Sequence, residues 1–335
     1  MTLLDYNLPM FKLNDQSINY DDKILFPIPI EIALSHLDLI DFDFYIVKNT
    51  EKFFKIRPGV EAIEEMLQRY KKNKISELYI ENVHYKKFLK SIKTRLSNKL
   101  FDPSTITLES EKVLSLNEAY TIVGTSLKKF GVNENIVDFI KDVNKQSISL
   151  MKDTPNIFLL FKEYKKKCKE GFLRSILTSF TASLIIRNYV WNNDKTMTSI
   201  SQASLLSEII LSNDELKLIS DYEGNFDQLP KSIKNYPFAT AELLKDDDSF
   251  ANEIIDCIEQ HCELPNGKGF PRQLSHSRIG QMPAILIIAR FFANELIKVK
   301  FDFTKKDEII SKLEDNFDYP VFKKHLSILL DVINN

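Results

Sequence analysis

Histidine and carboxylate side chains decide which metal chemistry a chain can perform. This sequence has no histidine between His84 and His261. Hydrolysis at two metal ions needs imidazoles and carboxylates that converge on both cations and leave a position for water. His261, Cys262 and Glu263 are consecutive, and neighbours on a helix point about 100° apart, so these three cannot chelate one ion. A zinc site from His261 and Cys257 with distant help is one reading. A buried, hydrogen-bonded histidine beside two small core cysteines is the reading we favour, and we predict no cofactor.

A loop of glycine, proline and charged residues follows His261 and forms the second candidate site. Loops held on a rigid scaffold are where binding residues gather. Lys268 and Arg272 can meet phosphate groups or acidic side chains, although exposed cations in loops are more often simply solvated. The candidate binding loop consists of Asn266, Gly267, Lys268, Gly269, Phe270, Pro271 and Arg272.

The elements near the N-terminus have strand character. β-branched and aromatic runs between turn residues predict strands over 24–34, 42–48, 52–57 and 76–81. After Pro58 the apolar spacing becomes helical, and residues 83–97 are helical again. We therefore predict a small α/β domain over residues 1–105, which ends in a linker at 101–109 where Asp-Pro-Ser breaks the periodicity.

The rest of the chain, residues 106–335, has helical periodicity throughout, so the predicted class is α+β and mainly α. Apolar spacing, glycine stops and N-terminal prolines predict helices over 110–130, 133–152, 156–169, 171–190, 198–211, 237–245, 249–262, 278–298, 305–315 and 320–333. The aspartate run 246–248 is expected to turn the chain between two helices and to provide the N-cap of the second.

Three stretches of the helical half carry a family resemblance in their sequence and in their order along the chain. They are NYPFATAELL (235–244), EQHCELPNGKGFPRQL (259–274) and RIGQMPAILIIARFFANELI (278–297). In this order they resemble the HD-GYP family, metal phosphohydrolases of the HD-domain type that hydrolyse cyclic di-GMP. The Gly-x-Gly-aromatic-Pro element is a moderately specific part of the resemblance. The resemblance implies a helical domain whose binding loop keeps the family's backbone shape.

The same resemblance implies that this chain has lost most of the family's metal ligands. The ligand positions are taken here by Arg174 or Thr178, Ser207, Glu208, Tyr236, His261, Cys262 and Arg290. Only His261 keeps its usual form. Leu264 stands where the family has an arginine that helps to hold a phosphate, and Phe270 stands where a tyrosine is usual. We therefore expect a pseudo-phosphodiesterase with no catalytic residues and no metal ligands.

Arg290 stands where the resemblance places a metal-binding aspartate. A guanidinium is permanently charged, so it opposes a divalent cation by several kcal/mol at close range. We predict that Arg290 fills the space of the metal and pairs with Glu208. The alternative is that Arg290 extends to solvent from an otherwise apolar helix.

Composition limits the classes of partner. The 45 basic and 47 acidic residues are well mixed and give a net charge of −2, so no long-range field attracts nucleic acid or anionic lipid. The longest apolar run, 282–293, is shorter than the roughly 20 residues that span a bilayer. Three cysteines and no apparent signal peptide fit a reducing compartment. We expect a cytoplasmic protein that binds neither nucleic acid nor membranes.

The sequence thus favours a catalytically inactive HD-GYP-like signalling or scaffold protein that binds other proteins. The resemblance points to a GGDEF-domain protein as one candidate partner, because the corresponding loop of the family contacts such domains. A homodimer through residues 110–170 is also expected. The alternative function is a sensor that binds cyclic di-GMP or another nucleotide without hydrolysing it. An active phosphodiesterase with replaced ligands is a third reading, which the depleted ligand set disfavours.

Overall fold

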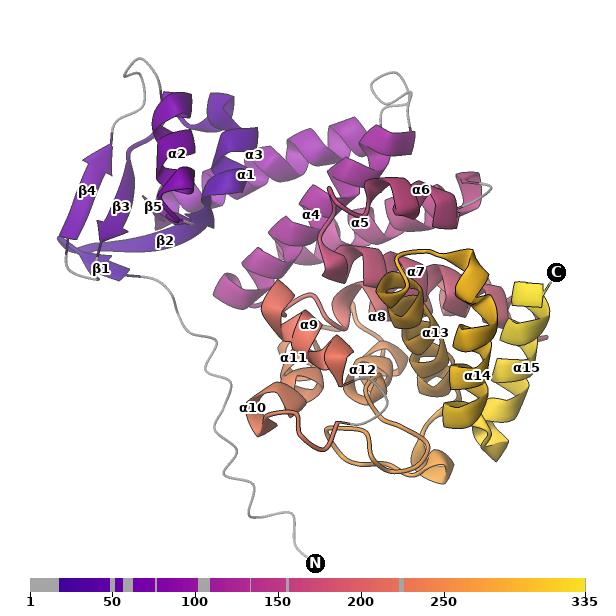
Figure 1. The fold of residues 1–335 in the computed structure, drawn as a ribbon. Coiled ribbons are helices and arrows are strands. Elements are labelled where there is room, and N and C mark those ends of the chain that lie inside the picture. The colour runs from indigo at the N-terminus through magenta and orange to yellow at the C-terminus, as the bar shows by residue number, and fades with distance from the viewer. Residues whose placement is uncertain are drawn as a thin grey trace, which may run out of the picture. The chain divides into compact units, whose positions relative to one another are not determined.

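The structure, a computed structural model, describes residues 18–48, 52–56, 63–75, 77–101, 109–132, 134–154, 157–222 and 226–334. These residues form two compact units, one before and one after the undescribed segment 102–108 (Figure 1). The predicted boundary between residues 105 and 106, and most of the predicted linker, lie outside the described residues.

The first unit contains an antiparallel sheet in the order β1-β2-β5-β3-β4. Its strands are β1 (Ile18–Tyr20), β2 (Lys23–Pro29), β3 (Phe44–Lys48), β4 (Lys52–Ile56) and β5 (Glu77–Glu81). Its helices are α1 (Ile30–Ser35), α2 (Ile63–Lys72) and α3 (Asn82–Phe101), and α1 and α3 pack against β2 and β5. The core of this unit joins apolar side chains of the sheet, such as Leu25 and Ile80, to Phe88 and Ile92 of α3, all fully buried.

The predicted strand over 24–34 is wrong in its second half. The strand ends at Pro29, and the chain continues directly into α1. Pro29 lacks a backbone donor, and after it Ile30 and Ala33 bury their side chains at the three-residue spacing of a helix. The sequence also gave no signal for the three residues of β1.

The second unit is helical, and its described elements are α4 (Glu109–Phe130), α5 (Glu134–Asp153), α6 (Ile157–Tyr164), α7 (Glu170–Ile186), α8 (Asp194–Leu206), α9 (Asn213–Asp221), α10 (Lys231–Lys234), α11 (Tyr236–Leu244), α12 (Asn252–Gln260), α13 (Gln281–Lys298), α14 (Lys306–Phe317) and α15 (Pro320–Asn334). Helices α7, α8 and α13 are its centre, and α7 packs along both of the others. Buried residues run almost without a break along α7 and α13. A helix that is apolar on all sides must lie in a core, so these two helices position whatever the centre holds.

Several predicted helix bounds are wrong, and the predicted helix over 156–169 ends at Tyr164. Helix α8 begins at Asp194, four residues before the predicted start, because the side chain of Asn193 accepts a hydrogen bond from the Thr196 amide and caps the helix. Helix α9 was not predicted, although Ser212 and Glu215 form a capping box at its start. The aspartate run does turn the chain, but Ala251 is the N-cap of α12, and no side chain caps that end.

Candidate functional site

Glu208 lies in a turn just after α8, at the centre of the helical unit. The sequence predicted that the helix would continue to residue 211, but it ends at Leu206. The hydroxyl of Ser207 donates to the Ala203 carbonyl oxygen at 2.6 Å, a bond that competes with regular helix continuation. The backbone amide of Leu211 then donates to the Glu208 carbonyl oxygen and closes the turn. Ser207 is thus occupied with its own helix, and the carboxylate of Glu208 is the group presented to the centre.

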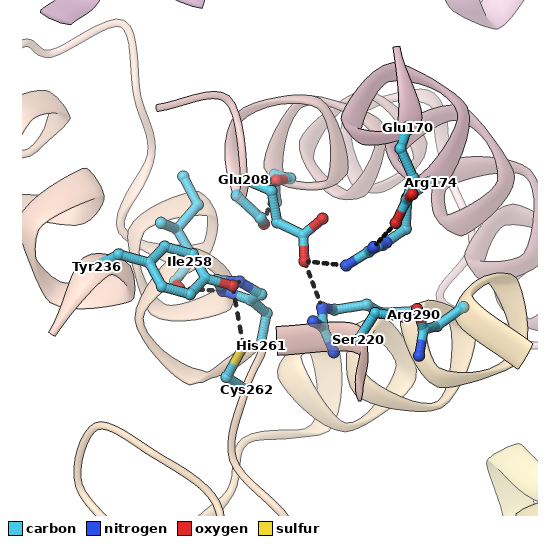
Figure 2. A network of polar contacts seen from close by, with 12 residues as sticks. Glu170, Arg174, Glu208, Ser220, Tyr236, Ile258, His261, Cys262 and Arg290 are labelled. Carbon is cyan, nitrogen blue, oxygen red and sulfur yellow. Dashed lines mark hydrogen bonds and ion pairs between the residues drawn. The ribbon is translucent and has the colours of Figure 1, made fainter. Parts of the chain in front are cut away.

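Two arginines bind this carboxylate. The Nε of Arg290 on α13 donates to Oε1 of Glu208 at 2.8 Å, and the Nη1 of Arg174 on α7 donates to the same oxygen at 3.3 Å (Figure 2). All three side chains are at most 4% exposed. The predicted pair of Arg290 and Glu208 is confirmed, and the alternative in which Arg290 reaches solvent is wrong.

A second carboxylate completes the cluster. The Nη2 of Arg174 donates to Oε1 of Glu170, one helical turn earlier on α7, at 2.5 Å. Arg174, and not the buried Thr178, is therefore the residue of α7 that contacts Glu208. Two guanidinium groups and two carboxylates alternate in a chain, which balances their charge. We call these four residues, Glu170, Arg174, Glu208 and Arg290, the ion cluster. The sequence analysis missed Glu170, although its spacing of four residues from Arg174 is the signal of a helical ion pair.

The arginines decide the ionisation state of Glu208. Burial alone raises the pKa of a carboxyl group, but here the positive charges of Arg174 and Arg290 outweigh burial and lower the pKa of Glu208 to about 2. The side chain is therefore a carboxylate at neutral pH, already bound by two fixed cations.

His261 lies at the end of α12 with both ring nitrogens hydrogen-bonded. Nδ1 lies 2.6 Å from the carbonyl oxygen of Ile258, which can only accept, so Nδ1 carries the proton. Nε2 then accepts from the hydroxyl of Tyr236 at 2.7 Å (Figure 2). Burial raises the pKa of Tyr236 well above its ordinary value, so this hydroxyl keeps its proton. The buried, satisfied histidine favoured by the sequence is confirmed.

The two late cysteines are buried, as predicted. Cys257 and Cys262 are each 1% exposed, and neither forms a disulfide. The Sγ of Cys262 lies 3.1 Å from the Tyr236 hydroxyl oxygen, and Cys262 belongs to an apolar cluster with Tyr236 and Phe270. Burial raises the pKa of the Cys257 thiol far above its ordinary range. A thiol in this state is a poor metal ligand, because metals bind the thiolate.

The residues at these positions do not fit a pair of divalent metal ions. A metal-binding histidine needs a ring nitrogen with a free lone pair, and the one such nitrogen of His261 accepts from Tyr236. Glu208 is neutralised by two guanidinium groups that cannot lose their charge. Within the described residues, no group of three or more histidine, cysteine, aspartate or glutamate side chains has a geometry that could hold a metal ion.

The candidate binding loop is anchored from below by Glu263, which is fully buried. The carboxylate of Glu263 accepts from the backbone amides of Arg272 at 2.7 Å and Leu274 at 2.8 Å. Inside the loop, Gly267 has a φ of +76°, and Gly269 packs so closely on the backbone of Glu263 and Leu264 that no larger residue fits. The loop is thus a defined structure on a rigid base.

The structure divides the predicted loop residues into exposed and buried ones. Asn266, Lys268 and Arg272 are exposed, whereas Gly269 and Phe270 are buried. The ring of Phe270 packs edge-on against Phe226, with centroids 4.8 Å apart, so Phe270 holds the loop. Its predicted part in binding stays a prediction. The exposed residues are available for recognition.

The buried histidine makes stability depend on pH. Burial, and then the charge of Arg290, lower the pKa of His261 to about 4, from 6.5 in an exposed histidine. The unfolded chain therefore takes up a proton below pH 6.5 that the folded protein refuses until about pH 4, and stability falls across this window as pH decreases. This shift alone should contribute about 3 kcal/mol to the loss of unfolding free energy between pH 7 and pH 4, and urea unfolding measures the total loss.

A histidine variant separates this contribution from that of His325, whose pKa burial also lowers to about 4. In His261→Gln, we expect the slope of unfolding free energy against pH to fall by roughly half in this window. The slope, and not the absolute stability, is the readout. An unchanged slope would contradict a neutral His261.

Comparison with known proteins identifies the fold. No protein-family model matches the chain, and no curated protein matches it. Among solved structures, the protein is similar to Bd1817, an HDG"Y"P protein from Bdellovibrio bacteriovorus, with 17% identity and a TM-score of 0.55. The similarity covers 93% of this chain and 100% of that one. The expectation of a mainly helical α+β fold of the HD-GYP type is confirmed.

Proposed function

We propose that this chain is a catalytically inactive signalling or scaffold protein, built on an HD-GYP-like fold, that acts by binding other proteins. The observation that carries the proposal is the ion cluster. Arg174 and Arg290 place two permanent positive charges against Glu208, and all three side chains are at most 4% exposed. The HD-GYP resemblance puts metal ligands at Glu208, at Arg290, and at either Arg174 or Thr178.

Electrostatics argues against metal loading at this site. A divalent cation beside Glu208 would lie close to two guanidinium groups, and the repulsion between them is strong because burial reduces screening. The carboxylate would also have to give up its hydrogen bond to the Arg290 Nε at 2.8 Å. Both costs oppose metal binding, so the chemistry of a bound hydroxide is not supplied here.

Metal analysis and a hydrolysis assay test the inactive state. Protein purified without chelator is expected to contain iron, manganese and zinc far below one equivalent, measured by inductively coupled plasma mass spectrometry. It is expected to release no linear product from cyclic di-GMP in the presence of added manganese. An active HD-GYP phosphodiesterase, purified and assayed in parallel, is the positive control. One or two equivalents of a tightly bound metal, together with turnover, would refute the proposal.

The exposed part of the loop is the proposed docking site. Lys268 is exposed, and within the described part of the chain its side chain forms no ion pair, while Arg272 is half exposed and binds Glu259 at 2.6 Å. Glu263 accepts from the backbone amide of Arg272, and the backbone amide of Lys268 donates to Oδ1 of Asn266. Such a rigid, positively charged turn suits acidic side chains of a partner, and a GGDEF-domain protein is the candidate that the resemblance suggests.

A comparison of loop variants tests the docking site. In pull-downs, Lys268→Glu combined with Arg272→Glu is expected to lose a partner that the unchanged protein retains, because two attractive charges become repulsive. Lys217→Glu combined with Lys231→Glu changes the net charge equally at exposed lysines outside the loop and is the matched control. Equal recovery of the partner by both double variants would mean that the loop is not the interface. Light scattering on the same samples measures the molar mass and so tests the proposed homodimer.

The alternative, a sensor for cyclic di-GMP, requires the same loop to hold phosphate. Arg272 already binds Glu259. The resemblance places a phosphate-binding arginine at position 264, where this chain has the buried Leu264. Isothermal calorimetry separates the two functions. Binding of cyclic di-GMP tighter than about 10 µM, lost in the Lys268 and Arg272 variant, would favour the sensor over the scaffold.

A further inference from the structure

A cavity of about 850 Å³ lies in the helical unit and shares no residue with the ion cluster or the binding loop. Side chains of α5, α7 and α8 line it, together with Asn192 and Asn193 between α7 and α8. The volume is in the range of small-molecule sites. All of its lining residues lie between 141 and 202.

Positive charge surrounds the mouth of this cavity. Its lining includes Lys141, Lys145 and Lys152 of α5 and Arg187 at the end of α7, all of which are exposed. Asp194 is the one acidic residue among the lining side chains. Four cations against one carboxylate is a local excess in a chain whose net charge is −2, so the mouth attracts anions.

The floor of the cavity has buried amide groups with unused hydrogen-bonding atoms. Asn144 is 3% exposed and Gln202 is 5% exposed, and both line the cavity. The Nδ2 of Asn144 donates to the Thr198 carbonyl oxygen at 3.4 Å. In the described part of the chain, however, the Oδ1 of Asn144 and the Nε2 of Gln202 have no hydrogen-bond partner and are almost inaccessible to solvent. An unpaired buried amide costs about 1–3 kcal/mol, so rotation of these side chains toward a ligand with one donor and one acceptor would remove that cost.

The walls between floor and mouth are apolar. Ile148, Phe180, Leu184 and Met197 line them, and each is only partly buried. An apolar wall favours a ring or a hydrocarbon body, while inorganic ions gain nothing from it. The floor therefore suits a polar group of a ligand, the walls suit its apolar body, and the mouth suits its negative charge.

We infer that this cavity binds a small organic anion. Its apolar or aromatic body packs on Phe180 and Met197, and its phosphate or carboxylate group meets the cations at the mouth. A polar edge bonds Asn144 and Gln202 once their amide groups rotate toward it. The inference does not rest on the proposed function, because none of these residues belongs to the ion cluster or the binding loop.

The fluorescent organic anion 8-anilinonaphthalene-1-sulfonate is a suitable probe, because its sulfonate and aromatic rings match the mouth and the walls. We expect one site per chain on the folded full-length protein. The double variant Lys145→Gln with Arg187→Gln is expected to bind at least tenfold more weakly. The control, Lys217→Gln with Lys231→Gln, removes the same charge at exposed lysines that do not line the cavity and should bind as the unchanged protein does. Thermal unfolding checks that every variant is folded.

Two further measurements identify the class of ligand. Thr198→Trp places a large side chain at the exposed edge of the cavity and should also abolish probe binding. Competition with a nucleoside monophosphate, an aromatic carboxylate and inorganic phosphate distinguishes the anionic groups, and we expect an organic anion to displace the probe where inorganic phosphate at equal concentration does not. Equal affinity in the cavity and control variants, or displacement by inorganic phosphate alone, would overturn the inference.

Discussion

Replacement of Glu208 by glutamine is expected to destabilise the protein by about 3–5 kcal/mol, the cost of removing one member of a buried ion pair. Glutamine keeps the size of the side chain but removes its charge. Arg174 and Arg290 would then lie close together, 1% and 4% exposed, without the carboxylate that now separates them. Urea unfolding followed by far-ultraviolet circular dichroism measures the change, because the helical unit dominates that signal.

Two controls test whether this cost comes from the buried charges. Glu308 is half exposed and pairs with Lys312 on the surface, so Glu308→Gln is expected to change stability by less than about 1 kcal/mol. The triple variant Glu208→Leu, Arg174→Met, Arg290→Met replaces the buried charges by apolar groups and should recover most of the lost stability. A Glu208→Gln protein as stable as the Glu308→Gln protein would contradict the ionised cluster.

Gly269→Ala is expected to disrupt the binding loop and to cost roughly 4 kcal/mol or more, which is in the exceptional range for one substitution. An added Cβ would lie 2.2 Å from the Leu264 amide nitrogen and 2.4 Å from the Glu263 Cα. Both are backbone atoms beside Glu263, so a shift of either would strain the hydrogen bonds from the Arg272 and Leu274 amides to the Glu263 carboxylate. Thermal unfolding and the loop pull-down measure the two consequences.

The neighbouring glycine is the matched control for this steric effect. An added Cβ at Gly267 would meet its nearest atom, the Gln273 carbonyl oxygen, only at 3.8 Å. Its φ of +76° disfavours alanine, so Gly267→Ala should cost about 1–2 kcal/mol by backbone strain alone. Equal effects of the two alanine substitutions would mean that close packing at Gly269 does not hold the loop.

The sequence was sufficient to predict the fold class and the central pair of the site. Helical periodicity is strong where a helix is long and buried, so the helices α4, α5 and α13 were predicted within about three residues of their bounds. A lone arginine in an apolar helix needs a buried partner or a route to solvent. That requirement, together with the HD-GYP resemblance, was enough to predict the contact between Arg290 and Glu208.

The parts that the sequence could not predict depend on tertiary contacts. Whether Arg174 or Thr178 faces Glu208 depends on how α7 is rotated against α13, and periodicity is uninformative for a helix that is buried on all sides. The role of Glu263 was missed because its two partners are backbone amides, which leave no mark in the sequence. The cavity beneath Lys145 and Arg187 was missed for a similar reason, since its lining comes from three separate helices.

The ion cluster also has a consequence for how this protein can change over generations. Any one substitution that brings a metal-binding carboxylate or imidazole to Arg174 or Arg290 also leaves the remaining charges of the cluster unbalanced inside the protein. Such a single substitution would lower the stability of the fold without creating a complete metal site. Metal binding at this site would therefore need several simultaneous substitutions in the ion cluster.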